Sequence, residues 1–179
     1  MRIIAGKYKG RKLTFPKNKT LRPTQDRVKE AVFSIIHNKL PQSRVLDLCC
    51  GTGGISIEAI SRGAELVVSV DTDTSIIRKN KELLSEEDQE KLKIVRKRLS
   101  SFFQVCRGKF DLIFFDPPWD SPDLYQIALK QIYEFDILSS GGILIVEFSK
   151  KMKVPFEDFK LTPTIHKYGD TLIGLITHD

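Results

Sequence analysis

Apolar positions along the chain follow two spacings that predict its secondary structure. Short apolar runs, such as "RVLDLC", "LVVSVD" and "FDLIFFD", are each followed by a stretch in which apolar residues recur every three or four positions. Continuous apolar runs are typical of strands buried on both faces, and the wider spacing is typical of helices that cover a sheet. From residue 44 onward, this alternation predicts an α/β fold with a parallel sheet and helices on both faces.

The first forty residues follow a different pattern. Segment 2–15 alternates short β-prone pieces with Gly6 and Gly10, which predicts a small hairpin. Apolar positions at helical spacing then predict a helix over about 24–39, with Thr24 as its N-cap.

Charge separates the same two parts of the chain. The chain has 29 basic and 23 acidic residues, a net charge of +6, yet ten of the basic residues and only two acids lie in residues 1–30. Such concentrated positive charge suits the phosphate backbone of a nucleic acid. We therefore predict a binding extension over 1–40 and an α/β domain over 41–179. The cations assigned to binding are Arg2, Lys7, Lys9, Arg11, Lys12, Arg22 and Arg27.

Length and cysteine content narrow the class of protein. A chain of 179 residues can bury the core of one domain. Its three cysteines lack zinc-ligand spacing and two are sequence neighbours, so neither a disulfide framework nor a metal site is predicted. No apolar stretch has the length of a bilayer span or the form of a signal peptide, which favours a soluble cytoplasmic protein.

A glycine loop follows the first apolar run in "VLDLCCGTGG". Gly51 and Gly53 let a ligand lie against the main chain, and Asp47 stands four residues before Gly51. Asp71 ends the next predicted strand, where an acid can accept two ribose hydroxyls. A dinucleotide site would have a third glycine where Ser56 stands. The pattern favours a nucleoside with a cationic amino-acid tail, as in S-adenosylmethionine.

The motif "FFDPPWD" places a carboxylate, two prolines and the chain's one tryptophan at the end of a predicted strand. Pro117 and Pro118 fix the backbone, so that the Asp116 carboxylate and the Pro117 carbonyl can face one point. Two acceptors at one point match the two N–H donors of a nucleobase amine and would aim its lone pair at an electrophilic methyl. Trp119 offers a face on which an unstacked base can lie.

These motifs resemble those of a known group of enzymes. "DLCCGTGG" followed by "DPPW" resembles class I S-adenosylmethionine-dependent methyltransferases of exocyclic amines. The stretches "RIIAGKYKGRKL", "LRPTQDRVKEAVFSII" and "IEAISRGA" resemble more narrowly the RsmD family, bacterial 16S rRNA (guanine-N2) methyltransferases. The likeness covers nearly the whole chain. It implies a Rossmann-like, mostly parallel seven-stranded sheet, in which "TLIGLIT" is the antiparallel strand near the C-terminus.

The resemblance also implies roles for the motif residues. The methionine part of the cofactor would lie on Asp47, Gly51 and Gly53, its ribose on Asp71, and the guanine on residues 116–119. The whole set expected to bind the cofactor is Asp47, Cys49, Gly51, Thr52, Gly53, Asp71 and Leu99. The implied substrate is 16S ribosomal RNA, as naked RNA, within a small-subunit assembly particle or in a finished subunit, and we expect the protein to be a monomer.

One position departs from the family pattern. Many relatives have an acid after the third strand that binds the adenine amine, whereas this chain has Arg98 near that place. The adenine is therefore expected to lie against backbone and apolar groups around Leu99 and Phe102.

Two other functions fit parts of the pattern. An adenine-N6 methyltransferase shares the "DPPW" motif, and an RNA-binding assembly factor could retain the fold without activity. Cys49 and Cys50 lie in the glycine loop without an adjacent base, so neither is predicted to be a nucleophile. The stretch "EEDQEKLK" is interpreted as a solvated helix end and loop.

Overall fold

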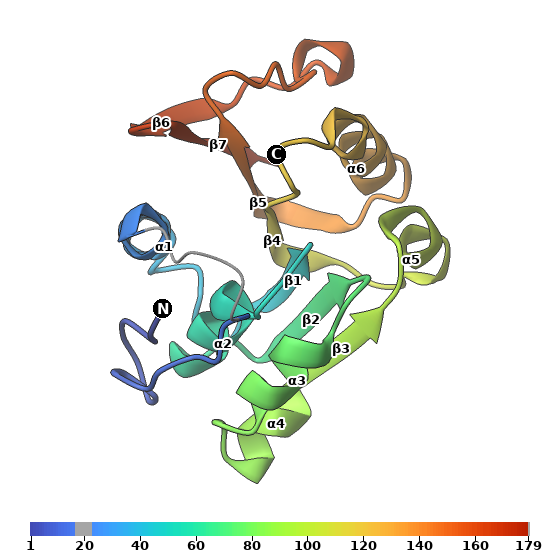
Figure 1. Ribbon diagram of the computed structural model, residues 1–179. Coiled ribbons are helices and arrows are strands. Elements are labelled where there is room, and N and C mark those ends of the chain that lie inside the picture. Colours follow the sequence, from blue (N-terminus) through green and yellow to red (C-terminus); the bar gives the residue numbers. More distant parts are fainter. Residues whose placement is uncertain (17–22, 179) are drawn as a thin grey trace.

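The computed structural model describes residues 1–16 and 23–178, and a seven-stranded sheet forms its centre (Figure 1). The strands are β1 Arg44–Leu48, β2 Leu66–Asp71, β3 Leu92–Arg96, β4 Phe110–Phe115, β5 Leu138–Ser149, β6 Thr164–Tyr168 and β7 Thr171–Thr177. Their order across the sheet is β3-β2-β1-β4-β5-β7-β6. Strands β1 to β5 are parallel, whereas β7 is antiparallel to β5 and β6. The predicted α/β fold and the antiparallel position of "TLIGLIT" are confirmed.

Helices cover both faces of the sheet, which is why its strands are apolar on both sides. They are α1 Pro23–Ile35, α2 Gly54–Ser61, α3 Ser75–Lys81, α4 Glu86–Lys91, α5 Leu99–Val105, α6 Pro122–Glu134 and the 3-10 turn η1 Glu157–Phe159. Helices α1 and α2 bury Phe33 and Ile57 against one face, and α5 and α6 bury Phe103 and Tyr125 against the other (Figure 1). Within the described residues, no helix is long and apolar enough to span a membrane.

The order of the strands reverses between β1 and β4. From β1 the chain adds β2 and then β3 on one side, and it then returns to add β4 and β5 on the other side. In open parallel sheets, the carboxyl ends of the strands beside such a reversal leave a crevice in which ligands bind. Both predicted motifs follow strands that end there, the glycine loop after β1 and "DPPW" after β4.

The N-terminal segment forms a short hairpin with little regular strand. Arg2 and Lys12 form a single antiparallel bridge, and the Ile3 N–H donates to the Arg11 carbonyl at 3.0 Å. Ile3, Tyr8 and Leu13 are buried in the same cluster of side chains as helices α1 and α2. The segment therefore shares a core with the α/β part of the chain, and the domain boundary near residue 41 stays a prediction.

The predicted bounds of the first helix need correction. Helix α1 begins at Pro23, so Thr24 lies inside its first turn and is not the N-cap. Proline suits the first helical position, because its ring fixes φ and it has no N–H to leave unpaired. The helix ends at Ile35, before the predicted end at 39, and the Lys39 N–H then donates to the Ile36 carbonyl at 2.9 Å in a tighter turn.

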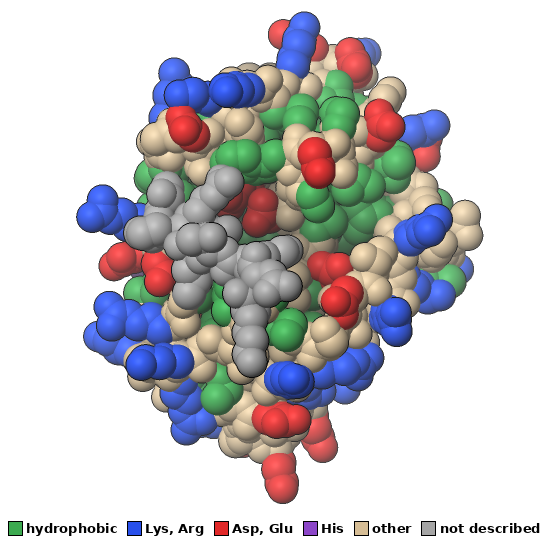
Figure 2. Space-filling model, viewed as in Figure 1, with side chains coloured by type: hydrophobic (Ala, Val, Ile, Leu, Met, Phe, Trp, Pro, Cys, Tyr) green, Lys and Arg blue, Asp and Glu red, His purple; other side chains and the backbone are tan. Residues whose placement is uncertain are grey.

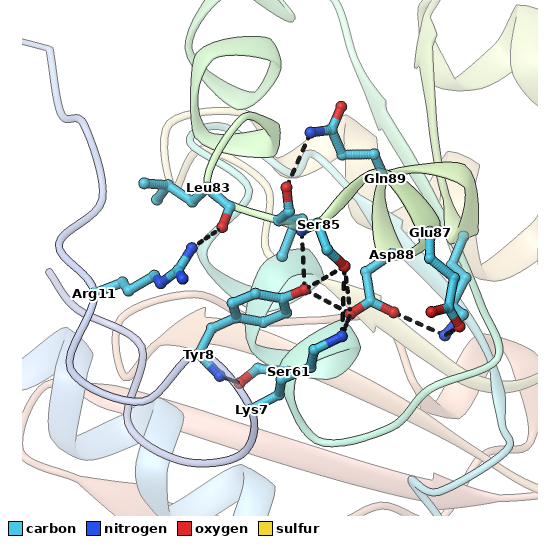
Figure 3. A network of polar contacts seen from close by, with 11 residues as sticks. Lys7, Tyr8, Arg11, Ser61, Leu83, Ser85, Glu87, Asp88 and Gln89 are labelled. Atoms are coloured by element: carbon cyan, nitrogen blue, oxygen red, sulfur yellow. Dashed lines mark hydrogen bonds and ion pairs between the residues drawn. The ribbon is translucent and has the colours of Figure 1, made fainter.

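The stretch "EEDQEKLK" is also more structured than predicted. Its residues 86–91 form helix α4, and Asp88 is only 4% exposed. This carboxylate accepts hydrogen bonds from Lys7 Nζ at 2.7 Å and from the Tyr8 hydroxyl at 2.6 Å (Figure 3). The prediction of a solvated helix end and loop therefore holds for the exposed Glu86, Glu87 and Glu90, but it missed the burial of Asp88, whose partners are far away in the sequence.

Candidate active site

One cavity of about 1240 Å³ opens at the carboxyl ends of β1, β2, β4 and β5. It is lined by the glycine loop, by the end of β2 and by residues 116–120 after β4. Figure 2 shows a hollow on this face with acidic side chains inside it. The fold thus brings together the cofactor motif and the strand-end motif that the sequence singles out.

Left-handed backbone conformations shape the glycine loop. Cys49, Gly51 and Gly53 have φ angles of 63°, 52° and 77°. A β-carbon on Gly53 would clash with Ile77 of helix α3, so that position needs glycine for space as well as for conformation. A β-carbon on Gly51 would meet no atom within 4 Å, so the main chain at Gly51 is open toward the cavity.

Asp71 joins the end of β2 to the glycine loop. One of its carboxylate oxygens accepts the Gly51 N–H at 2.8 Å, and the other accepts the Asp73 N–H at 3.2 Å. A carboxylate has about four lone-pair sites, so these bonds leave capacity for further donors. Asp71 therefore fixes the loop and can still accept hydrogen bonds from a ligand.

Asp47 lies beneath the loop and is 2% exposed. Burial raises the pKa of Asp47 to about 7, although the hydrogen bond from the Ser56 hydroxyl works in the opposite direction. Ser56 also lies 2.7 Å from the Ser69 hydroxyl, so the position where a dinucleotide site would have glycine holds a polar side chain beneath Asp47. In the sequence, the only sign of this hydrogen bond to Asp47 was the serine at position 56.

Asp116 follows β4 directly and opens to the cavity. Protein atoms surround it closely on its other sides, and this desolvation, together with the nearby Glu147 carboxylate, raises the pKa of Asp116 well above its ordinary value. Pro117, Pro118 and Trp119 also line the cavity, and Trp119 is half-buried. The indole therefore lies at the wall of the cavity, where a planar base can reach it.

Glu147 on β5 is an acid that the sequence analysis missed. It lines the same cavity, and burial raises the pKa of Glu147 to about 7. The buried Tyr125 of helix α6 donates its hydroxyl to the Glu147 carbonyl at 3.1 Å. The only signal in the sequence was a single acid inside the apolar run "GILIVEF".

The structure places the two residues expected near the adenine, Leu99 and Phe102, in different surroundings. Leu99 lines the cavity, together with Lys97 and Arg98. Phe102 is 4% exposed and packs edge-on against Phe103, with ring centroids 5.6 Å apart. Phe102 therefore belongs to the core under helix α5, whereas Leu99 is available to a ligand.

The two cysteines of the loop are poorly suited to nucleophilic chemistry. Burial raises the pKa of Cys49 to about 12, and the pKa of Cys50 is raised further. A thiol reacts as its thiolate, so both side chains stay unreactive near neutral pH.

The cations predicted to bind RNA have different surroundings. Lys7 forms an ion pair with Asp88, and the Arg11 guanidinium lies 5.0 Å from the centre of the Tyr8 ring and donates to the Leu83 carbonyl (Figure 3). Arg2, Lys9, Lys12 and Arg27 are exposed. Arg22 lies outside the described residues. Lys7 and Arg11 therefore already hold the N-terminal segment on the domain.

Glu58 of helix α2 is the main anchor of that segment. It is fully buried, and its two carboxylate oxygens accept the Ile4 N–H at 2.8 Å and the Ala5 N–H at 3.0 Å. Lys29 of helix α1 lies 3.3 Å from Glu58 and also donates to the Arg2 carbonyl at 2.8 Å. We call this group of residues 2–5, Lys29 and Glu58 the N-terminal clasp.

Known proteins share this architecture. A solved structure described as "Putative methyltransferase yhhF from Escherichia coli" covers 100% of this chain and 98% of its own, with a TM-score of 0.84 and 25% sequence identity. The "Putative rRNA methyltransferase YlbH" of Bacillus subtilis is 33% identical over 87% of this chain and 86% of its own. The "Ribosomal RNA small subunit methyltransferase D" of Haemophilus influenzae is 32% identical over 84% of this chain and 79% of its own.

The parallel sheet with its loop, acids and strand-end motif around one cavity defines a Rossmann-like methyltransferase. The model of the family described as Conserved hypothetical protein 95 matches residues 1–176, and the chain belongs to this family. The relatives named Ribosomal RNA small subunit methyltransferase D confirm the predicted resemblance to the RsmD family.

Proposed function

We propose that the protein transfers a methyl group from S-adenosylmethionine to the exocyclic N2 amine of a guanine in 16S ribosomal RNA. The observation that carries this proposal is that Asp116 and Trp119 line the same cavity as Gly51 and Asp71. A site for a base and a site for a nucleoside cofactor are thereby adjacent. Relatives named for the small-subunit ribosomal RNA support the choice of substrate.

The residues of the glycine loop fit S-adenosylmethionine. The open space at Gly51 admits a ligand against the main chain, and Asp71 has free acceptor capacity for the ribose hydroxyls. Asp47 would favour the positively charged methionine part, and Leu99 would lie against the adenine. When bound, the cofactor supplies an electrophilic methyl group on a sulfonium.

The strand-end motif holds the target amine. Asp116 and the Pro117 carbonyl accept its two N–H bonds, which leaves the nitrogen lone pair directed at the methyl group. Trp119 stacks on the flipped base, a contact worth roughly 1–3 kcal/mol. The raised pKa of Asp116 makes this carboxylate a suitable acceptor for the proton that the amine loses.

The basic N-terminal segment contacts the RNA backbone in this proposal. Arg2, Lys9, Lys12 and Arg27 present exposed charges for phosphate, which positions the RNA without reading its sequence. We propose that the protein acts as a cytoplasmic monomer on a small-subunit assembly particle.

Ribosomal RNA from cells with and without this protein tests the function. Mass spectrometry of its nucleosides is expected to show one N2-methylguanosine that is lost with the protein and restored when purified protein methylates the undermethylated subunit. Loss of N6-methyladenosine instead would assign the enzyme to adenine. Unchanged nucleosides in both preparations would overturn the proposal.

A further inference from the structure

Glu147 on β5 and Asp116, one residue beyond the end of β4, occupy neighbouring positions at the edge of the sheet. Strands β4 and β5 are parallel, and the last pair in their register is Phe115 with Val146. Asp116 and Glu147 each follow this pair by one residue. Paired residues of adjacent strands point to the same face of a sheet, so the two side chains leave the sheet edge side by side.

Burial along both strands identifies that face. Phe115 and Val146 belong to the core cluster under helices α5 and α6. Phe114 and Ile145, one residue earlier, belong to the cluster under α1 and α2. Because successive side chains alternate, Asp116 and Glu147 both lie on the α1 side, where the cavity opens.

The surroundings of Glu147 leave its carboxylate available to a ligand. Its neighbour on β7 is the buried, apolar Ile173, and Tyr125 bonds to the backbone carbonyl of Glu147 rather than to its side chain. Within the described part of the chain, no hydrogen bond reaches the Glu147 carboxylate. A desolvated carboxylate without donors is unfavourable, so this position needs a partner that supplies one.

We propose that Glu147 accepts the N1–H of the target guanine while Asp116 accepts from its N2 amine, and that Glu147 thereby selects guanine over adenine. This inference rests on the proposed function. Guanine presents N1–H and the N2 amine next to each other on its Watson–Crick edge, so two adjacent carboxylates match two adjacent donors. Adenine presents an unprotonated N1 beside its amine, and a lone pair would then face the Glu147 carboxylate.

The desolvation of the two carboxylates supports this assignment. Burial raises the pKa of Glu147 to about 7, and the pKa of Asp116 is raised by the same cause and by Glu147 itself. Two neighbouring carboxylates repel each other, and donors to both relieve that repulsion. The repulsion between the two carboxylates is therefore relieved only by a base with two adjacent donors, and this favours guanine.

The test compares two RNA substrates that differ at the target base. One carries guanosine, and the other carries 2-aminopurine riboside, which keeps the 2-amino group but has a lone pair in place of N1–H. The wild-type protein is expected to prefer guanosine, as measured by kcat/KM. In Glu147→Gln, whose amide can donate to an unprotonated N1, the preference is expected to fall about ten- to hundredfold.

Two further variants make the comparison decisive. Glu157→Gln alters an exposed carboxylate on η1 and is expected to keep the wild-type preference. Glu147→Ala removes the repulsion without adding a donor, and it is also expected to lower the preference. Cofactor affinity by calorimetry, equal in all variants, establishes that each of them is folded.

The outcomes separate the inference from the proposed function. If the wild-type protein methylates guanosine and both Glu147 variants keep its preference, the role of Glu147 is refuted while the function stands. If the wild-type protein leaves guanosine unmethylated in RNA that contains its site, the proposed function itself fails.

Discussion

Asp47, Asp116 and Glu147 share one cavity, and burial raises the pKa of each of them. Three acids in a partly desolvated site repel one another unless protons or ligands neutralise them. A cationic cofactor and a base rich in N–H donors are ligands that do so. In the proposed function, relief of this repulsion adds to the affinity for both the cofactor and the base.

The Asp47→Asn variant tests the cost of this buried charge through the free energy of unfolding. The pKa of Asp47 is higher in the folded state than in the unfolded chain, so its contribution to stability decreases as pH rises from about 4 to about 7. We expect the unliganded variant to be more stable than wild type at about pH 8.5, on the order of 1–3 kcal/mol, with a smaller difference at about pH 5. Urea unfolding at the two pH values measures this difference. An equal difference in stability at both pH values would show that the charge of Asp47 does not destabilise the fold.

Asp116→Ala is expected to separate catalysis from cofactor binding. The variant lacks one acceptor for the target amine, and kcat should fall by roughly 10²–10³-fold. Its dissociation constant for S-adenosylmethionine should stay within a few fold of wild type, because the proposed role of Asp116 concerns the target amine and not the cofactor. Single-turnover methylation and calorimetry provide the two readouts. Near-normal turnover would show that Asp116 is not an acceptor for the target amine.

At the scale of elements, helix α2 both ends the glycine loop and anchors the N-terminal segment. Its first residues follow Gly53, and Glu58, one turn later, accepts the backbone N–H groups of Ile4 and Ala5. The N-terminal clasp therefore connects the basic segment to the helix beside the cofactor site. Displacing the basic segment is therefore expected to disturb helix α2, and displacing helix α2 is expected to disturb the segment.

Glu58→Ala tests that connection. Removing one partner of a buried charged pair leaves Lys29 unpaired, which typically costs about 3–5 kcal/mol. We expect lower resistance to urea, and faster hydrogen exchange at the amides of Ile4 and Ala5 than in the rest of the core. Glu65→Ala, at an exposed acid just beyond the same helix, is the matched control. Unchanged protection of both amides would show that other contacts hold the segment.

The elements were predictable where local sequence decides the structure. The apolar runs around Asp47 and before Asp116 are typical of strands that are buried on both faces. The strands, and the positions of both motifs at their ends, could therefore be predicted from the sequence. Glu58, Asp88 and Glu147 were not predictable, because their roles depend on partners distant in sequence. The Ile4 N–H lies 54 residues from Glu58, and the Tyr8 hydroxyl lies 80 residues from Asp88.

Across the whole molecule, the positive charge of the N-terminal segment has one structural use and one proposed use. Lys7 pairs with Asp88 inside the network of Figure 3, whereas Lys9 and Lys12 are exposed. Lys7, one of the cations that were predicted to bind RNA, therefore stabilises the fold.

Charge reversal is expected to distinguish these uses. Changing Lys9 and Lys12 together to glutamate should weaken RNA binding and flatten its salt dependence, by roughly 0.7–0.9 in the log–log slope for each phosphate that is no longer neutralised. Thermal stability should change little in that double variant. Lys7→Glu should instead lower the melting temperature, because it places two acids against each other at Asp88. A salt titration of RNA binding and a thermal scan check both, and an unchanged slope in the double variant would contradict the RNA-binding role.

The N-terminal clasp also constrains the time at which the chain can complete its fold. During synthesis, residues 4–8 leave the ribosome before their partners, because Glu58 and Ser61 follow more than 50 residues later and Asp88 follows about 80 residues later. Until then the cluster that buries Ile3, Tyr8 and Leu13 is incomplete, and the cations between these residues oppose aggregation of the segment. Residues 4–8 are thus fixed in place long after they are made, and their docking reports that helices α2 and α4 have already formed.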